Sequence, residues 1–372
     1  GPAGLIAALA ETQAGARVII ADEQNEFGGS LLSSTATIGG DPAMDWVEQV
    51  VAALAEHDNV TLLPRSTVFG YFDHNFLTIA ERCTDHLGPV DDDRVRQRLW
   101  RVRAKQVVLA QGAFERPLAF CNNDRPGVML ASAVSTYIRR YAVRPGERAV
   151  VFTNNDSAYQ AAIDLAESGA SVIVIDSRAG GAGALGDAAK AASIQVLAGH
   201  ILTDVKGVGR VTAANVAAWS SDAADTVENT IRIDCDLVAM SGGWSPAVHL
   251  YSHAGGRNRW DGERLCFVPG EPGEQNVSAG AGNGKWLLGD CLEDGLRAAA
   301  LVLSRLGYEP PDLAVPATED AQTRAIEALW RVPAATDPER CPKQFLDYQN
   351  DTSVADVRLA VREGFRNVEH VK

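Results

Sequence analysis

The feature that most constrains this chain is a strand–helix–strand pattern that occurs twice and closes each time on an acid. Residues 1–22 contain a glycine turn, a helix of small residues and a continuous apolar strand that ends at Asp22. Residues 145–176 repeat the pattern and end at Asp176. Strands without polar alternation are typical of parallel sheets that are covered by helices on both faces. The pattern therefore predicts an α/β fold with two nucleotide-binding βαβ units.

The order of these units predicts the domain organisation. The first unit is interrupted by the complete second one, after which residues 236–243 bring back an apolar strand with a glycine pair, and residues 290–306 a long helix. This order is typical of the two-dinucleotide-binding-domain, glutathione reductase-like fold. We expect a discontinuous dinucleotide-binding domain at 1–117 and 241–312, an inserted degenerate Rossmann-like domain at 118–240, and a linker with a small helical domain at 313–372, with one linker helix at 319–330.

Composition argues against several classes of function. With 34 Lys and Arg against 48 Asp and Glu, the formal net charge of −14 disfavours a nucleic-acid or anionic-membrane surface. No apolar run is long enough to span a bilayer. The 6 cysteines form no Cys-x-x-Cys pair and the 7 histidines have no ligand spacing, so we expect no metal site and a reducing, cytoplasmic location.

A nucleotide site is expected at the first glycine turn. Gly1 would let the backbone approach a pyrophosphate, and Gly4 would allow close packing of helix and strand. Asp22 follows at the spacing of a ribose-binding acid, and Gly28-Gly29 adds a turn after the strand. Carboxylates there repel a 2′-phosphate, so Asp22 and Glu23 favour NAD or an adenosine nucleotide over NADP. Because Gly1 lies inside the motif, we expect further chain upstream.

The second turn lacks the glycines that a dinucleotide needs. Residues 153–158 read Thr-Asn-Asn-Asp-Ser-Ala, and their side chains would crowd a pyrophosphate. We expect Asp156 or Ser157 to cap the following helix instead. Gly289-Asp290 imitates the pair that holds a flavin ribityl chain in this fold, but the glycine turn after the apolar strand comes earlier, and its equivalent position is Ala281. FAD is therefore the less favoured nucleotide in the first domain.

Longer motifs resemble one protein family over essentially the whole chain. They are Thr67–His74, Gly112–Pro117, Asn122–Met129, the unusual turn Thr153–Tyr159, Ser241–Trp244, Ala279–Gly284, Asp347–Asp351 and Val361–Phe365. Together they resemble the α subunits of bacterial heterotetrameric sarcosine oxidases. The region around Glu115-Arg-Pro is shared more widely, with proline dehydrogenase, opine oxidase and hydrogen cyanide synthase subunits.

The resemblance implies a complex that oxidises sarcosine with oxygen to glycine and hydrogen peroxide and passes the one-carbon unit to tetrahydrofolate. It implies NAD in this chain, FAD and FMN in the complex, mainly on the β subunit, and the β, γ and δ subunits as partners. The tetrahydrofolate domain is expected beyond Lys372. We accordingly expect a nucleotide-binding scaffold that has no catalytic residue in this stretch and is inactive by itself.

The family's NAD contacts carry over onto matching positions of this sequence. The resemblance implies Ala3 at the phosphate turn, Asp22, Glu23 and Gln24 near the ribose, Ser30, the backbone of Val68 at the adenine, and then Gly282, Leu287 and Gly289. Gln24 and Gly282 stand where the family pattern has Arg and Ala. The expected cofactor-binding set also includes the turn glycines Gly1, Gly4, Gly28 and Gly29, with Gly112 and Gly280 after two apolar strands.

The last segment resembles a small helical domain that binds a [2Fe–2S] cluster through a Cys-x-Cys pair in related oxidoreductases. The two positions here are Asp347 and Gln349, so we expect no cluster. Three alternatives to the oxidase subunit remain open. One is the α subunit of a proline or opine dehydrogenase, whose nucleotide would be ATP. The others are a stand-alone FAD- and NAD(P)H-dependent reductase, against which residues 153–158 count, and a structural module with an empty cleft.

Overall fold

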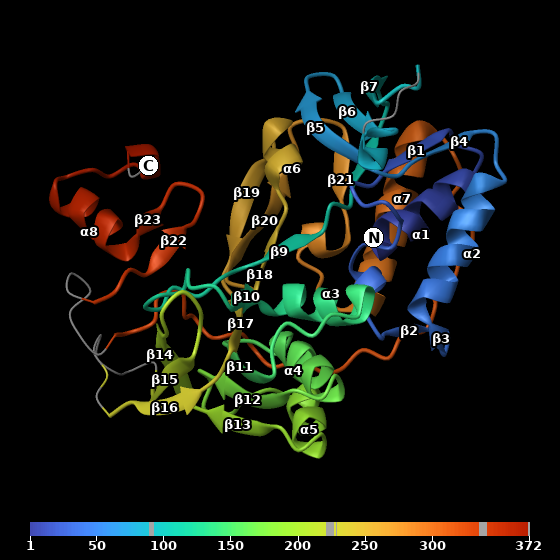
Figure 1. The fold of residues 1–372 in the computed structure, drawn as a ribbon. Helices are drawn as coiled ribbons and strands as arrows, with labels where there is room; N and C mark the ends of the chain where they lie inside the picture. Colours follow the sequence, from blue (N-terminus) through green and yellow to red (C-terminus); the bar gives the residue numbers. More distant parts are fainter. Residues whose placement is uncertain (89–92, 221–226, 228, 335–340, 371–372) are drawn as a thin grey trace. The chain divides into compact units, whose positions relative to one another are not determined.

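The computed structural model describes residues 1–88, 93–220, 227, 229–334 and 341–370. The chain divides into two compact units (Figure 1). Unit 1 consists of Gly1–Phe114 and Ser245–Asp320, and unit 2 of Glu115–Trp244 and Ala321–Lys372. The segment Glu115–Trp244 of unit 2 is thus inserted into the chain of unit 1, as the two-dinucleotide-binding-domain fold requires, and the second segment of unit 2 follows unit 1.

Unit 1 is built on short parallel strand pairs and the helices that pack against them. β1 (Val18–Ala21) pairs with β4 (Val60–Leu63), and β8 (Val107–Leu109) pairs with β21 (Asn276–Ser278). The helices are α1 (Pro2–Gln13), α2 (Ala43–Ala55), α6 (His249–His253) and α7 (Leu288–Leu306). Leu5 of α1 and Leu54 of α2 are completely buried in the core that these two helices share with β1.

Small residues let α1 and α7 run against each other (Figure 1). Ala3, Ala7 and Ala10 of α1 are buried. On α7, a Cβ atom at Gly295 would lie only 2.4 Å from the carbonyl oxygen of Ala3. A side chain at Gly295 would therefore push the helices apart and displace the first turn of α1.

Antiparallel elements complete unit 1. β5 (Ser66–Phe72), β6 (Phe76–Arg82) and β7 (Gln97–Arg103) form a three-stranded sheet in that order, so β5 is an edge strand. The shorter antiparallel elements are the hairpin β19 (Arg257–Asp261) and β20 (Cys266–Glu271) and the pair β2 (Thr37–Ile38) and β3 (Asp41–Pro42). The 3-10 turns are η1 (Gly29–Ser33), η2 (Asp85–Leu87) and η3 (Gly280–Asn283). β9 (Ala113–Glu115) pairs with β18 (Trp244–Pro246).

Unit 2 contains a five-stranded parallel sheet in the order β10-β17-β11-β12-β13. Ala149 and Val151 of β11 pack among the helices, whereas Val150 and Phe152 point to the opposite face, where a second core forms. This two-sided burial explains the unbroken apolar strands in the sequence. The elements are β10 (Val128–Leu130), β11 (Arg148–Thr153), β12 (Ser171–Asp176), β13 (Gln195–Ala198), β17 (Leu237–Ser241), α3 (Ala131–Tyr141), α4 (Ala158–Glu167) and α5 (Ala184–Ala191).

The second face of this sheet packs on an antiparallel sheet of β14 (His200–Lys206), β15 (Ala213–Ala218) and β16 (Ile231–Asp234). The C-terminal residues of unit 2 form β22 (Phe345–Asp347), β23 (Thr352–Ser353), α8 (Val354–Arg362) and η4 (Val368–His370). Ser353 and Asp356 form a capping box at the start of α8.

The helix expected at 319–330 is wrong. Residues 321–329 form no helix and run along unit 2 as an extended segment, which we call the strap. The backbone N–H of Glu327 donates to the Asn154 carbonyl (3.0 Å), and the Glu327 carbonyl accepts from the Asn154 side chain (2.8 Å). Because the backbone of the strap finds these partners in unit 2, the tertiary bonds override local helix propensity.

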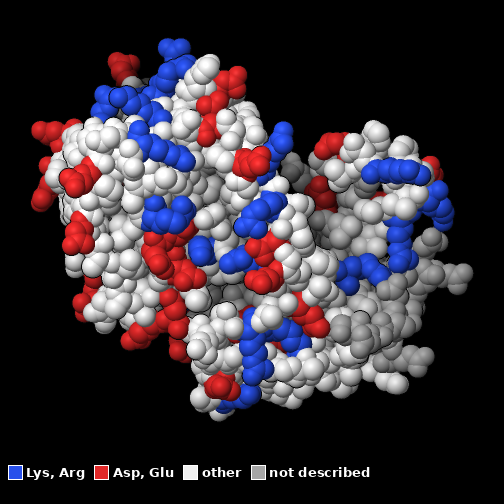
Figure 2. All heavy atoms as spheres, turned by 180° about the vertical axis from the view of Figure 1, so that it is seen from behind, with Lys and Arg blue, Asp and Glu red and all other residues white. Residues whose placement is uncertain are grey.

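The surface carries both signs of charge: basic and acidic side chains lie interspersed on the face shown in Figure 2. Among the helices in the described ranges, none combines the length and the apolar composition that a membrane span needs.

Candidate nucleotide-binding site

The structure brings together three features within the first 30 residues of unit 1. The backbone nitrogen of Gly1 lies 3.6 Å from a carboxylate oxygen of Asp22 at the end of β1. A Cβ atom at Gly29 would lie 2.7 Å from the Cα atom of Gly1. Gly28 and Gly29 both have positive φ values, 138° and 60°. The glycine turn, the acid and the second turn therefore form one site, with Ser30 exposed at its edge in η1.

The turns that follow β8 and β21 lie against the start of α1. A Cβ atom at Gly4 would meet the Ala110 side chain at 3.2 Å, and one at Gly280 would meet the Ala3 side chain at 2.6 Å. Gly282 in turn lies close to Gly112, since its Cβ position is 3.5 Å from the Gly112 backbone nitrogen. The strand ends, the two glycine turns and the first turn of α1 are thus neighbours.

Asp294 holds the second of these turns, and the sequence analysis missed it. Its side chain is 4% exposed. It accepts hydrogen bonds from the Gly280 backbone (2.9 Å) and the Asn283 side chain (3.0 Å), and Arg297 Nε donates to it at 2.6 Å. An acid on the apolar face of a helix next to Gly295 was the available signal, because a buried carboxylate needs such partners.

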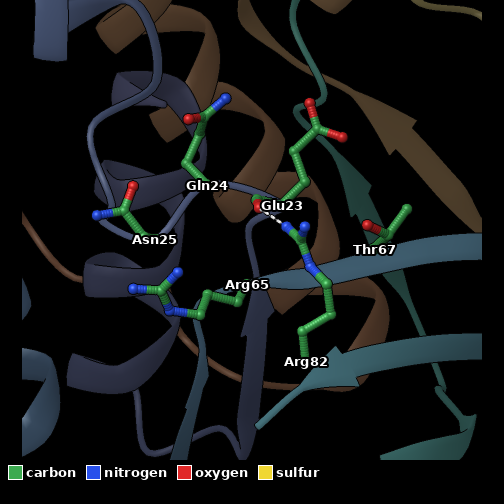
Figure 3. Close-up of a pocket in the computed structure, with 6 residues that line it drawn as sticks. All are labelled: Glu23, Gln24, Asn25, Arg65, Thr67 and Arg82. Carbon is green, nitrogen blue, oxygen red and sulfur yellow. Dashed lines mark hydrogen bonds between the residues drawn. The ribbon is translucent and has the colours of Figure 1, made fainter. Parts of the chain in front are cut away.

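A polar hollow of about 430 Å³ opens beside the end of β1 (Figure 3). Asp22 accepts the Gln24 backbone N–H (3.0 Å) and thereby shapes the loop that follows the strand. The hollow is lined by Glu23, Gln24, Asn25, Arg65, Thr67 and Arg82. Val68, the next residue of edge strand β5, is half-buried and pairs with Ile79. Glu23 and Gln24, which are expected near the ribose, line this hollow, whereas Arg65 and Arg82 are not predicted by the sequence motifs.

Leu287 and Gly289 lie at the start of α7, where a carboxylate already binds. The backbone N–H groups of Leu288 and Gly289 donate to the Asp320 side chain at 2.9 and 2.7 Å. Thr318 also donates to Asp320, at 2.8 Å. A negative group at a helix N-terminus is favourable. The amide of Gly289, one of the residues in the expected cofactor-binding set, is therefore hydrogen-bonded within the chain.

The corresponding place in unit 2 is filled by buried charge. Asp176, which ends β12 as Asp22 follows β1, is completely buried and accepts from Arg178 Nη2 (2.8 Å) and the Tyr159 hydroxyl (2.8 Å). Arg178 Nη1 also donates to Asp156 (2.6 Å). Burial alone would lower the pKa of Arg178, but the bonds and charges of Asp176 and Asp156 raise it above its ordinary value.

The strap closes the same place. The second carboxylate oxygen of Asp156 accepts the backbone N–H groups of Arg324 (3.1 Å) and Gly183 (3.0 Å), and Arg178 Nη1 donates to the Ala325 carbonyl at 3.2 Å. Ser157 occupies the N-cap position of α4, one of the two residues expected there, but it makes no side-chain cap bond. Asp156 is instead occupied by Arg178 and two backbone N–H groups.

Asp347 stands at a position where related oxidoreductases have a cluster-binding cysteine, and here it stabilises a turn. Its carboxylate accepts the backbone N–H groups of Gln349 (2.8 Å) and Asn350 (3.2 Å), so it shapes the turn between β22 and β23. Within the residues that the structure describes, no group of three or more His, Cys, Asp or Glu side chains is placed to hold a metal ion.

Comparisons with known proteins agree with this architecture. Residues 341–372 match the family model described as "Sarcosine oxidase A3 domain". The whole chain is 39% identical to the sarcosine oxidase subunit alpha of Corynebacterium sp. (strain P-1) and spans 39% of that protein's length.

Solved structures share the fold at low sequence identity. L-proline dehydrogenase from P. horikoshii has a TM-score of 0.70 and 18% identity, over 100% of this chain and 67% of that one. Thioredoxin reductase from T. acidophilum has a TM-score of 0.60 and 18% identity, over 82% of this chain and 96% of that one. The expected two-dinucleotide-binding-domain fold is confirmed. Over its whole length the chain is similar to sarcosine oxidase α subunits, which are parts of an oxidoreductase.

Proposed function

We propose that this chain is the NAD-binding part of the α subunit of a flavin-dependent sarcosine oxidase, and that it holds the nucleotide as a scaffold. One observation carries the proposal. In unit 1 the turn at Gly1, the acid Asp22 and the turn at Gly28-Gly29 converge beside a polar hollow, whereas the corresponding place in unit 2 is filled. Only one of the two βαβ units is therefore suited to a dinucleotide.

The residues of unit 1 fit such a group. A Cβ atom at Gly29 or Gly280 would collide with Gly1 or Ala3, so the backbone here forms a cradle that side chains would fill. Bare backbone and the N–H groups at the start of α1 suit a pyrophosphate. Asp22 and Glu23 would accept ribose hydroxyls. The other proposed contacts are Gly4, Gln24, Gly28, Ser30, Val68, Gly112, Gly282, Leu287 and Gly289.

The filled cleft of unit 2 counts against the stand-alone reductase. Such an enzyme needs a second nucleotide there to reduce the first. NAD supplies hydride transfer when a redox partner faces its nicotinamide. Arg178, Asp156 and the backbone of the strap take the place that the second nucleotide would need. We therefore assign this stretch no catalytic residue.

The activity of the whole protein is proposed from the family. The complex would oxidise sarcosine to glycine with release of hydrogen peroxide and pass the one-carbon unit to tetrahydrofolate. FAD and FMN, mainly on the β subunit, would carry out the oxidation, with the γ and δ subunits completing a cytoplasmic heterotetramer. Tetrahydrofolate would bind to the part of the α subunit that follows this stretch.

The test is to denature the full-length subunit, purified in its complex, and to identify the nucleotide released from it by mass spectrometry. About one equivalent of NAD, lost in an Asp22→Ala variant that still assembles, is the expected result. FAD in this site would overturn the proposal in favour of a reductase. ATP would move the assignment to the proline or opine dehydrogenase subunits, and no nucleotide would indicate a structural module.

A further inference from the structure

Two arginine side chains that the nucleotide motifs do not predict line the hollow beside β1. Arg65 and Arg82 both line it, together with the Glu23–Asn25 loop and Thr67 (Figure 3). The two arginines differ in surroundings. Arg82 is exposed, and its Nη2 donates to the Glu23 backbone carbonyl at 2.8 Å. Arg65 is half-buried, and within the described part of the chain no carboxylate pairs with it.

The backbone of Arg65 is held in place from two sides. Its N–H donates to the Gln24 carbonyl (2.7 Å), and its carbonyl accepts the Arg82 N–H (3.0 Å). The next residue, Ser66, donates its N–H to the Asp22 carbonyl at 2.8 Å. Arg65 also has a φ of 54°, which non-glycine residues rarely adopt. The side chain therefore leaves from a fixed point at the end of the ribose-binding loop.

This position suits the base of an adenosine nucleotide. Asp22 marks the ribose, and the edge strand β5 begins at Ser66, directly after Arg65. A planar guanidinium without an acid partner can stack on an aromatic ring and donate to ring nitrogens at the same time. Glu23, in the same hollow, disfavours a further phosphate beside the ribose.

We propose that Arg65 is a specificity-determining residue of this site, which binds the adenine ring of the dinucleotide. The inference rests on the proposed nucleotide site and adds a residue to it. It assigns to Arg65 contact with the base, and to the glycine turns and Asp22 contact with the pyrophosphate and ribose. We expect the affinity of every ligand that carries adenine to depend on Arg65.

The test measures dissociation constants by calorimetry on the full-length subunit in its complex, after the resident nucleotide has been removed. The variants are Arg65→Gln and Arg65→Lys, with Arg101→Ala as the control, an exposed arginine on β7 outside the hollow. The ligands are NAD, ADP-ribose, AMP and nicotinamide mononucleotide, of which only the last lacks adenine. Melting temperatures of all variants check that they fold.

Arg65→Gln should weaken NAD, ADP-ribose and AMP by about 10- to 30-fold and leave nicotinamide mononucleotide unchanged, since one stacked or hydrogen-bonded base contact is removed. Arg65→Lys should recover only part of the loss, because an ammonium group keeps the charge and lacks the planar face. The control should match the wild type. The inference is overturned if Arg65→Gln binds NAD within twofold of wild type, or if NAD weakens while AMP does not, which would assign Arg65 to the pyrophosphate. Absence of NAD binding in the wild type would instead overturn the proposed function.

Discussion

The two βαβ units follow the same chain order and differ at the place where a nucleotide would bind. In unit 1 the acid Asp22 lies beside bare glycine backbone at the edge of a polar hollow. In unit 2 the acid Asp176 is completely buried and bound to Arg178. Both acids stand at the carboxyl end of a parallel strand, so strand order alone does not separate a binding cleft from a closed one.

The difference shows what closes a Rossmann-like cleft from within. Once side chains such as those of Asn154 and Asp156 replace glycines, their polar atoms become buried and need partners. Arg178 and the strap supply these partners. The resulting network fills this place with buried, hydrogen-bonded side chains. At the corresponding turns of unit 1, glycines bring no side chain whose polar atoms would need partners.

The largest effect on stability is expected when the buried charge network of unit 2 loses its cation. Arg178→Ala leaves Asp156 and Asp176 buried without their cation, which should lower the free energy of unfolding by about 3–5 kcal/mol. Denaturant unfolding of the full-length subunit measures this change. Arg144→Ala is the control, because Arg144 forms an exposed ion pair with Glu147 at 3.7 Å in the same unit and should change stability by at most about 1 kcal/mol. Nucleotide content should stay at the wild-type level, and its loss would show that the two clefts depend on each other.

Adding a single methyl group at Gly280 should weaken nucleotide binding in unit 1. In Gly280→Ala the new Cβ would lie 2.6 Å from the Ala3 side chain, so α1 must shift from the phosphate position. We expect NAD affinity to fall about 100-fold, which corresponds to about 2.7 kcal/mol. Gly39→Ala matches the backbone conformation, with φ of 67° against 65°, and has nothing within 4 Å. If both variants lose NAD equally, backbone strain rather than the collision is responsible.

A smaller effect should follow when the glycine turn loses its buried acceptor. Asp294→Asn removes the charge that receives Gly280, Asn283 and Arg297, and should reduce stability by about 1–2 kcal/mol and NAD affinity by about tenfold. Thermal unfolding and calorimetric titration check the two values. Asp290→Asn changes an exposed acid on the same helix and should alter neither. A loss of nucleotide in that control would restore the flavin-type role of Gly289-Asp290.

A further effect concerns the pH dependence of unit 1. Burial raises the pKa of Glu11 in α1 to about 7 from an ordinary value of 4.5. The folded state therefore holds the proton more tightly than the unfolded chain, and this contribution is full below pH 4.5 and is lost as the pH rises through 7. Glu11→Gln should raise the free energy of unfolding by about 3 kcal/mol at pH 8 and leave it unchanged at pH 4. Equal shifts at both values, measured by denaturant unfolding, would contradict the assignment.

Much of the fold was predictable because local pattern and tertiary burial agree. The apolar strands expected to close the two units at Asp22 and Asp176 are β1, which ends one residue before Asp22, and β12, which ends at Asp176. The long helix was expected from 290 and begins at Leu288. The failure at 319–330 has the opposite cause: the strap bonds to Asn154, which no local pattern reveals.

The candidate site was predictable only in part, and for a similar reason. Spacing along one βαβ unit pointed to Gly1, Gly4 and Asp22, because the turn and the acid are parts of one local motif. Arg65 and Asp294 enter the site from a loop before β5 and from α7, so their neighbours are set by packing. Neither residue type is unusual enough in the sequence to mark its role.

Local patterns in the sequence were enough to predict the two βαβ units, their nested order and the contrast between a glycine turn at 1–4 and a side-chain-filled turn at 153–158. These follow from short-range rules, in which glycine allows close approach and apolar runs form buried strands. The packing of distant segments, by contrast, brings Arg178 and the strap together in unit 2, and Arg65 and Asp294 to the candidate site of unit 1. Burial requires each polar group to find a partner, and that partner is chosen by distance in space rather than along the chain.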